Sequence, residues 1–297
     1  MWEYITFGLI VQLFVNGILF GTMYGIAAIG LSLIFGTMRI IFLAQGTMII
    51  FMAYVCYWIF TLMGIDPYLS LILIVPLSLV IGMGLYHALF REAAGLEDKN
   101  ISLLIAVGLM FLVENLIMVL WTANPRSITT SYTLLSFKPM GINISFTRLM
   151  GLSIAVISTT GVLLFLKKTL IGMAVRAASE DIISATLMGI SPHRVNAVAF
   201  AIGIGLAGVA GVGLATIYPF DPYYGFIFAL KAMISLAIGG IGSVFGALFG
   251  GILLGLLESL ASFFFTGGWS DAIAYAAFLI VLMFKPEGLF VRSVKKA

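Results

Sequence analysis

The sequence predicts an all-α polytopic membrane protein with about 8–10 transmembrane helices, some of them broken or short. Of its 297 residues, 62% are hydrophobic and 9% are charged, and the mean hydropathy is +1.19. Soluble domains carry about 25% charged residues, so this composition excludes an ordinary water-soluble fold. Long uncharged runs alternate with short polar stretches, and many runs reach the roughly 20 residues that cross the hydrocarbon. We therefore expect a single transmembrane domain over residues 1–297.

Taken in order, the apolar runs give nine expected spans. They cover residues 4–38, 40–63, 68–90, 101–121, 148–166, 195–218, 225–238, 244–265 and 269–284. The first run is long enough for one tilted helix, or for a helix followed by a half-helix. Pro76 predicts a kink in the third span, and the run 225–238 is short for a full crossing. About nine crossings are therefore expected.

The positions of lysine and arginine predict the orientation of the chain. If the spans cross simply, one side collects the following basic residues: Arg91, Lys99, Lys167, Lys168, Arg176, Arg194, Lys285, Arg292, Lys295 and Lys296. The positive-inside rule makes that side cytoplasmic, and the C-terminus with it. The polar loop 122–147 is then external. The N-terminus lacks a basic region, so the first run is expected to be a retained span and not a cleaved signal.

The most polar internal stretch is the loop 167–194. Its middle has helical periodicity, with an apolar stripe made of Val175, Ile182, Ile183, Ala185, Thr186 and Met188. Gly189 is expected to end this helix, and Pro192 prevents its continuation. An amphipathic helix between two spans can lie on the lipid headgroups or fit a groove on a soluble partner. The pattern alone leaves both open.

Three ionisable residues lie inside apolar runs: Glu114, Lys231 and Glu258. A charge at the centre of a membrane helix costs at least about 2.5 kcal/mol, so such groups pair, face a cavity or are neutralised. Lys231 and Glu258 occur on neighbouring segments of opposite direction, so they can form a pair. A structural ion pair, the lining of a water-filled path and a proton relay all remain open for them. For Glu114 we favour a structural role.

Glycines recur at small-residue spacing in two regions. Gly17, Gly21 and Gly25 form a face that lets another helix approach closely, and residues 239–255 carry seven further glycines. The second tract is not a phosphate-binding loop, because no Lys-Ser or Lys-Thr follows it and no strand precedes it. It either packs helices or breaks a helix so that backbone groups face a transported solute.

The chain offers little to an enzyme. Its two histidines are far apart in the sequence, and no nucleophile or zinc-protease motif occurs. The single cysteine, Cys56, lies in an apolar run and provides no disulfide framework. We expect no catalytic residues, no metal and no cofactor in this chain.

Several stretches resemble one family. Residues 16–46 (NGILFGTMYGIAAIGLSLIFGTMRIIFLAQG) are similar to the opening of the permease subunits of branched-chain amino acid ABC importers. The central loop matches the family's R-A-x-x-E-D…A…G-I signature through Arg176, Glu180, Asp181 and Gly189. Lys231 and the tract GGIGSVFGALFGGILLGLLES match a third motif, and the closing Lys285-Pro286-Glu287-Gly288-Leu289 resembles the family's ending. These motifs occur in the family's order over nearly the whole chain.

The resemblance implies a permease in a bacterial inner membrane. It would pair with a second, similar permease, with two cytoplasmic ATPases that bind ATP, and with an extracytoplasmic solute-binding protein. The central loop then becomes an ATPase-coupling helix. A translocation path is expected to involve the following residues: Asn16, Gln45, Lys231, Gly239, Gly240, Gly242, Ser243 and Glu258.

The sequence departs from the family at Gln45, where a histidine is usual, and at Phe42-Leu43, where Ile-Asn is usual. Branched-chain amino acids are the expected solutes, but relatives also import other amino acids, urea, amides or organic acids. The competing hypothesis is an ion- or proton-coupled secondary transporter that uses Lys231, Glu258 and Glu114 as a relay. Uptake that collapses with the proton gradient and needs no partner would favour it.

Overall fold

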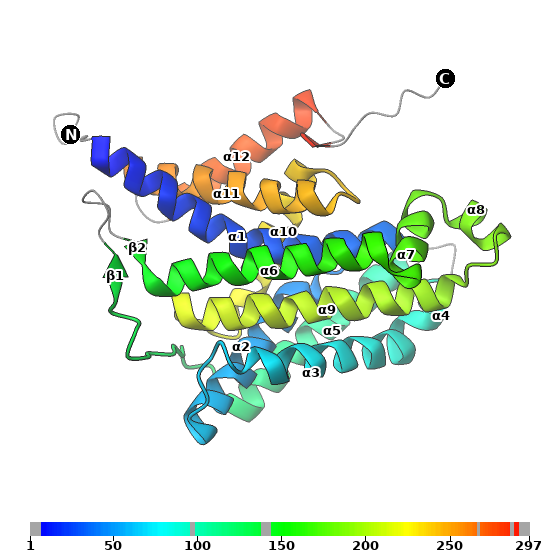
Figure 1. Cartoon of the computed structure of the whole chain (residues 1–297), viewed down its shortest axis with the longest axis horizontal. Helices are drawn as coiled ribbons and strands as arrows, with labels where there is room; N and C mark the ends of the chain where they lie inside the picture. Colours follow the sequence, from blue (N-terminus) through cyan, green and yellow to red (C-terminus); the bar gives the residue numbers. More distant parts are fainter. Residues whose placement is uncertain (1–6, 96–98, 138–143, 266–267, 286–287, 291–297) are drawn as a thin grey trace.

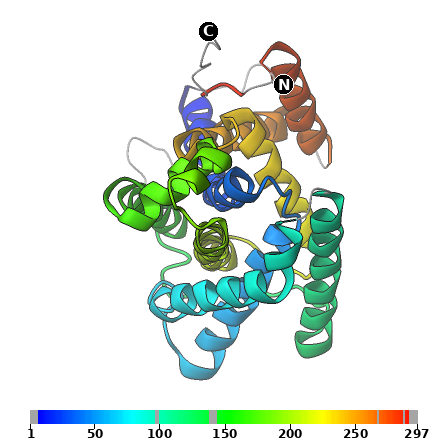
Figure 2. The same cartoon turned by 90° about the vertical axis from the view of Figure 1, so that its right-hand side faces the viewer.

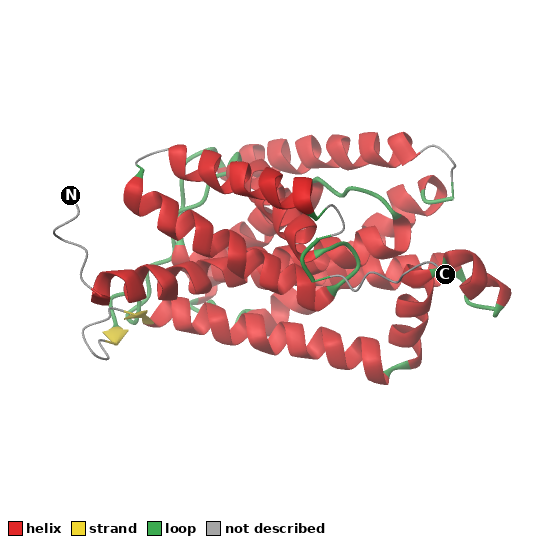
Figure 3. Cartoon of the chain, turned by 90° about the horizontal axis from the view of Figure 1, so that it is seen from above, coloured by secondary structure: helices red, strands yellow, loops and turns green. Residues whose placement is uncertain are grey.

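A computed structural model of the chain describes residues 7–95, 99–137, 144–265, 268–285 and 288–290. Most helices run side by side along the long axis, with a small sheet at one end and two short helices at the other (Figures 1 and 3). We call these the sheet end and the α8 end. The elements are α1 (Phe7–Met38), α2 (Ala44–Met63), α3 (Leu71–Leu85), the π-helix η2 (Tyr86–Phe90), α4 (Arg91–Ala93), α5 (Lys99–Trp121), β1 (Ser136–Phe137), β2 (Ile144–Ser145), α6 (Phe146–Lys168), α7 (Leu170–Glu180), α8 (Ile182–Leu187), α9 (Pro192–Ile217), α10 (Tyr224–Gly239), α11 (Val244–Phe264) and α12 (Trp269–Phe284).

Within these residues, seven helices are long and apolar enough to cross a membrane. They are α1, α2, the continuous stretch from α3 to α4, α5, α6, α9 and α11. Two shorter apolar helices, α10 and α12, match the remaining expected spans and bring the total to nine if both cross. The first run is one unbroken helix of 32 residues, which removes the alternative of a helix and a half-helix.

The second span begins later than the sequence predicts. Arg39 adopts a left-handed conformation with φ of 54° and ends α1, and α2 starts only at Ala44. The residues between them are not helical, because Phe42 turns into the core and contacts the rings of Phe90 and Phe200 at centroid distances of 5.7 and 4.9 Å. Aromatic packing therefore replaces about one helical turn here.

The third span stays helical through Pro76, so the kink there remains a prediction, and it then passes into a π-helical turn over η2. A π-turn inserts one residue into a helix and changes the direction of the side chains that follow. Here it accompanies complete burial of Tyr86 and Phe90, which both lie against the ring of Phe200 on α9.

Helix α9 lies in the middle of the bundle, where Figure 2 shows it end-on between its neighbours. Most of its side chains are buried inside the chain. Its small residues permit this: a Cβ at Gly203 would lie 3.0 Å from the carbonyl oxygen of Gly30, and one at Gly211 would lie 2.5 Å from that of Ile49. The backbones of α1 and α2 can therefore approach α9 directly.

The predicted small-residue face of α1 is confirmed, and its partner is α11. A Cβ at Gly21 would lie 2.5 Å from the Cα of Ile252, and a Cβ at Gly251 would lie 2.3 Å from the amide nitrogen of Gly25. Each helix thus presents glycines to the backbone of the other. Of the tract 239–255, the part beyond Gly250 serves this contact.

Loop segments at the sheet end are tied to the bundle. Arg126 and Phe220 exchange two backbone hydrogen bonds of 2.9 Å, and the Tyr132 hydroxyl donates to Asp66 at 2.6 Å. The two strands pair antiparallel with Ser136 opposite Ser145. The described part of the loop 122–147 therefore folds over this end, as expected from its polarity.

Candidate coupling and translocation site

The amphipathic stretch expected to be one helix is two helices, so that prediction was wrong. Helix α7 ends at Glu180 and α8 begins at Ile182, while Asp181 between them has an extended backbone with φ of −150° and ψ of 104°. The Asp181 carboxylate accepts hydrogen bonds from the Ser184 hydroxyl (2.5 Å) and from the backbone amides of Ile183 (2.9 Å) and Ser184 (3.2 Å).

Asp181 is therefore the N-cap of α8. An aspartate side chain satisfies the free amides of a first helical turn, which explains why the chain interrupts the helix at this residue. The hydrogen bonds from Ser184 and Ile183 also hold the pKa of the exposed Asp181 carboxyl below its usual value. The acidic motif residue thus has a local structural function that the periodicity did not reveal.

The predicted apolar stripe is divided by this break. Val175 on α7 and Ala185 on α8 are buried, as expected, but Ile183 and Met188 are 71% and 84% exposed. Leu187 beside them is 83% exposed. We call Ile183, Leu187 and Met188 the apolar tip. A group of large apolar side chains at the polar end of a membrane protein is typical of a surface that another element covers.

The predicted stop at Gly189 is confirmed. Gly189 has φ of +85°, where residues with a Cβ are strained, and α8 ends two residues before it. Its amide donates to the carbonyl oxygen of Thr186 at 2.9 Å, and the amide of Ile190 donates to that of Ala185 at 3.1 Å. These bonds are typical of a glycine-terminated helix. Pro192 then occupies the first turn of α9.

A cavity of about 820 Å³ joins two motifs that are far apart in the sequence. Arg176 and Glu180 of α7 line it on one side, and Gly242 and Ser243 of the glycine-rich break line it on the other. Gly36 at the end of α1 also lines it. The central-loop motif and the glycine-rich break are therefore neighbours at the α8 end, which no spacing rule in the sequence predicts.

The glycine tract packs helices and breaks one. A Cβ at Gly239 would lie 2.0 Å from the carbonyl oxygen of Gly246, so α10 and α11 contact each other through backbone. Gly240 and Gly242 have φ of +98° and +84°, which accounts for the turn between these helices. Ser243 then caps α11 by accepting from the amide of Gly246 at 3.0 Å. A path-lining role for this break stays a prediction.

The closing motif packs against the same break. The amide of Leu289 donates to the carbonyl oxygen of Ile238 at 2.8 Å, and a Cβ at Gly288 would lie 2.4 Å from the Cα of Gly240. Phe290 contacts the ring of Phe249 at 5.5 Å. The chain end thus covers the turn after α10. Pro286 and Glu287 of this motif lie outside the described residues.

The predicted pair of Lys231 and Glu258 is confirmed as a salt bridge. Asp271 on α12 adds a second carboxylate, with its Oδ1 3.1 Å from the Lys231 Nζ. The hydroxyl of Tyr24 accepts from the same ammonium at 3.3 Å, and its ring centroid is 5.3 Å away. The ammonium is thus surrounded by acceptors from α1, α11 and α12, which favours the structural reading of the pair.

Sequence reasoning missed Asp271. The residue stands at the start of a span, where an aspartate usually faces water and helps to begin a helix. The sequence does carry one hint. The last three expected spans contain two acidic residues, Glu258 and Asp271, but only one lysine, Lys231. Only the packing of α12 on α10 and α11 brings it to Lys231.

The remaining predicted site residues lie away from the Lys231 cluster. Asn16 accepts a 2.7 Å hydrogen bond from Arg148 and lines a cavity of about 590 Å³ at the sheet end. Gln45 is fully buried between α2 and α9 and donates to the carbonyl oxygen of Gly203 at 3.0 Å, while its Oε1 has no partner. Glu114 is half-buried on α5. Neither Gln45 nor Glu114 belongs to the Lys231 cluster.

These features define a multi-pass helical membrane protein with a helix pair at one end and a broken glycine-rich helix beside it. Residues 13–282 match the family described as the branched-chain amino acid transport system permease component. The chain belongs to this family, and it is a permease subunit.

Individual proteins support the assignment. The chain is 29% identical over 95% of both lengths to the high-affinity branched-chain amino acid transport system permease protein BraD of Pseudomonas aeruginosa. It is 29% identical to LivH of Escherichia coli K12, covering 93% of this chain and 94% of that protein. The structure of PsaBC from Streptococcus pneumoniae shares the fold, with a TM-score of 0.51 over 92% of this chain at 12% identity.

Proposed function

We propose that this chain is the permease subunit of an ATP-driven importer of amino acids, with branched-chain amino acids as the first candidates. The observation that carries the proposal is the end of the bundle where the Asp181-capped helix pair shares a cavity with the break at Gly242 and Ser243. A movement of α8 at this end would be transmitted over a short distance to α10, α11 and α1.

The exposed side chains at the α8 end also support a set of partners. Two cytoplasmic ATPases, which bind the ATP, would each receive an apolar tip in a surface groove, since the tip leaves three large side chains uncovered. A second permease of the same family would complete the path, and an external binding protein would deliver the solute. The α8 end, with Arg176 and Arg194, is then cytoplasmic in the inner membrane, as is the C-terminus.

The mechanism is alternating access. Closure of the ATPases would pull on α7 and α8, and the helices joined through glycine contacts would tilt as rigid bodies. Most solute selection would belong to the binding protein. The names of the relatives support branched-chain amino acids as the solutes. Gln45 stands where the family usually has a histidine, so the solute is to be identified by direct binding measurements.

The apolar tip provides the sharpest test. Replacing Ile183, Leu187 and Met188 with glutamine in the assembled transporter should reduce co-purification of the ATPases and lower ATP-driven uptake at least about tenfold. A matched control is Leu62→Gln, because Leu62 is 75% exposed near the far end of α2. The tip is a better target than Glu180 and Asp181 together, since losing Asp181 also removes the cap of α8.

Normal uptake by the tip variant, with the ATPases bound, would contradict the proposed coupling surface. Identification of the solute uses the binding protein, titrated with leucine, isoleucine and valine and then with urea and amides. The secondary-transporter hypothesis has less support, because Glu114, the third member of the relay it requires, lies on α5 and apart from the Lys231 cluster.

A further inference from the structure

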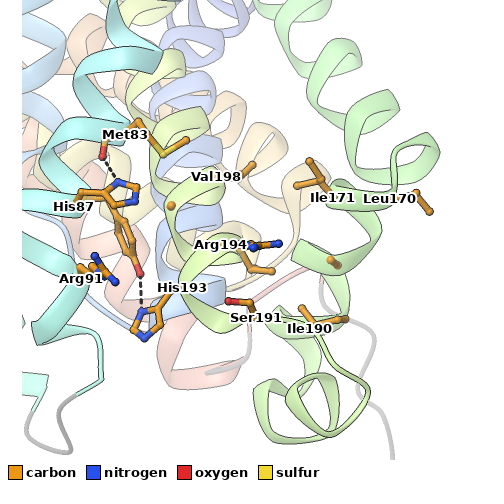
Figure 4. Close-up of a pocket in the computed structure, with 14 residues that line it drawn as sticks. Met83, His87, Arg91, Leu170, Ile171, Ile190, Ser191, His193, Arg194 and Val198 are labelled. Carbon is orange, nitrogen blue, oxygen red and sulfur yellow. Dashed lines mark hydrogen bonds between the residues drawn. The ribbon is translucent and has the colours of Figure 1, made fainter.

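A second cavity at the α8 end shares no lining residue with the cavity between α7 and the glycine-rich break. Its volume is about 730 Å³, within the range of small-molecule sites, and η2, α7 and the start of α9 enclose it. Figure 4 shows His87 and Arg91 on one wall, Leu170 and Ile171 on the opposite wall, and His193 and Arg194 between them. The cavity thus has a basic side and an apolar side.

On the basic side, the described residues provide no carboxylate within salt-bridge distance of the two arginines. Arg91 and Arg194 are both exposed, and among the described residues neither guanidinium makes a salt bridge. The described residues that line the cavity include no carboxylate. Two arginines that share a cavity without an acid attract an anion, and the guanidinium fork matches a phosphate group.

The apolar side continues along the bundle. Leu170 is 83% exposed and Ile171 54% exposed on α7, and Met83 faces the same cavity from α3. From Met83, the side chains of Val80 and Leu77 follow at helical spacing and are also exposed. These residues form an uncovered apolar strip on a membrane span, where hydrocarbon chains are the natural neighbours.

We infer that this cavity is a binding site for an anionic phospholipid. Arg91 and Arg194 would bind its phosphate, and its acyl chains would lie against Leu170, Ile171 and the strip of Met83, Val80 and Leu77. Basic pockets between membrane helices bind the headgroups of anionic lipids by this combination of charge and depth. The lipid would bridge η2 and α7, which line opposite walls of the cavity.

The test measures lipid binding to the full chain in detergent by native mass spectrometry. Phosphatidylglycerol should bind one to one and at least about tenfold more tightly than phosphatidylcholine with the same acyl chains. Glycerol phosphate, which has the phosphate but no chains, should not compete at matched concentration. Equal binding of the two lipids, or competition by glycerol phosphate, would overturn the inference of an anionic-lipid site.

The variants locate the site. Arg91→Gln with Arg194→Gln should weaken phosphatidylglycerol binding about 10- to 30-fold. Lys167→Gln with Lys168→Gln removes the same charge from the same end of the bundle and should change binding at most about twofold. An equal loss in both double variants would mean that general charge attraction, and not this cavity, holds the lipid.

Two single variants probe the apolar wall. Ala174→Phe fills the cavity from α7 and should weaken phosphatidylglycerol binding, while Leu164→Phe on the exposed side of α6 should not. Thermal melting of every variant separates lost binding from lost folding. Wild-type binding by both Ala174→Phe and the arginine variant would refute the site.

Discussion

The contact of α1 with α11 and the pair α7–α8 differ in what each leaves uncovered. Between α1 and α11 the glycines permit backbone contact, with no space for a Cβ at Gly251 or Gly255. At α7 and α8 the chain instead exposes Ile183, Leu187 and Met188. The first region completes its packing within one chain, whereas in the proposed transporter the second region packs against an ATPase. Substitutions should therefore harm folding in the first region and assembly in the second.

The largest effect is expected at Gly251. Its substitution by leucine would place a Cβ 2.3 Å from the amide nitrogen and 2.5 Å from the Cα of Gly25, so α1 and α11 must separate. We expect a loss of more than about 4 kcal/mol in stability and little monodisperse protein. Gly161→Leu is the control, since a Cβ there meets nothing within 4 Å. Similar melting temperatures for both variants would contradict the close contact.

A smaller loss is expected from the buried charges. Lys231→Met leaves Glu258 and Asp271 without their cation, and breaking such a pair costs about 3–5 kcal/mol. Glu258→Gln should cost less, because Asp271 still neutralises the lysine. The measurement is thermal melting in detergent, with the exposed Lys168→Met as control. If Lys231→Met melts at the wild-type temperature, the cluster does not contribute to stability.

The smallest effect on overall stability is expected at Asp181. Asp181→Ala removes the acceptor of three hydrogen bonds, so the amides of Ile183 and Ser184 should exchange hydrogen faster while α9 stays protected. Asp181→Asn retains an acceptor and should lose less. Unchanged exchange in α8 of the alanine variant would show that the cap does not hold this helix.

The same cap predicts a pH dependence confined to α8. Because folding lowers the pKa of the Asp181 carboxyl, its stabilising contribution is present above the unfolded pKa and is lost as the pH falls through the lowered value. Amide exchange in α8 should therefore accelerate in acid before exchange in α9 does. The alanine variant should lack this step.

Much of the fold could be predicted from the sequence, since apolar length and composition fix membrane helices directly. The spans over α5, α6, α9, α11 and α12 agree with their predicted limits within a few residues. The errors lie where one side chain overrides a periodic pattern. Asp181 caps a helix inside an amphipathic stretch, and Phe42 keeps four residues out of α2 by entering the core.

By itself the sequence determined the class of protein, the helices and the glycine faces, and it allowed the pairing of Lys231 with Glu258, because these depend on composition and on neighbouring segments. Only the tertiary structure decided that Asp271 joins that pair, that Arg176 and Glu180 share a cavity with Gly242 and Ser243, and that α1 packs on α11. Each of these contacts joins segments distant in the chain, and a pattern of residues along one helix does not specify which other helix it meets.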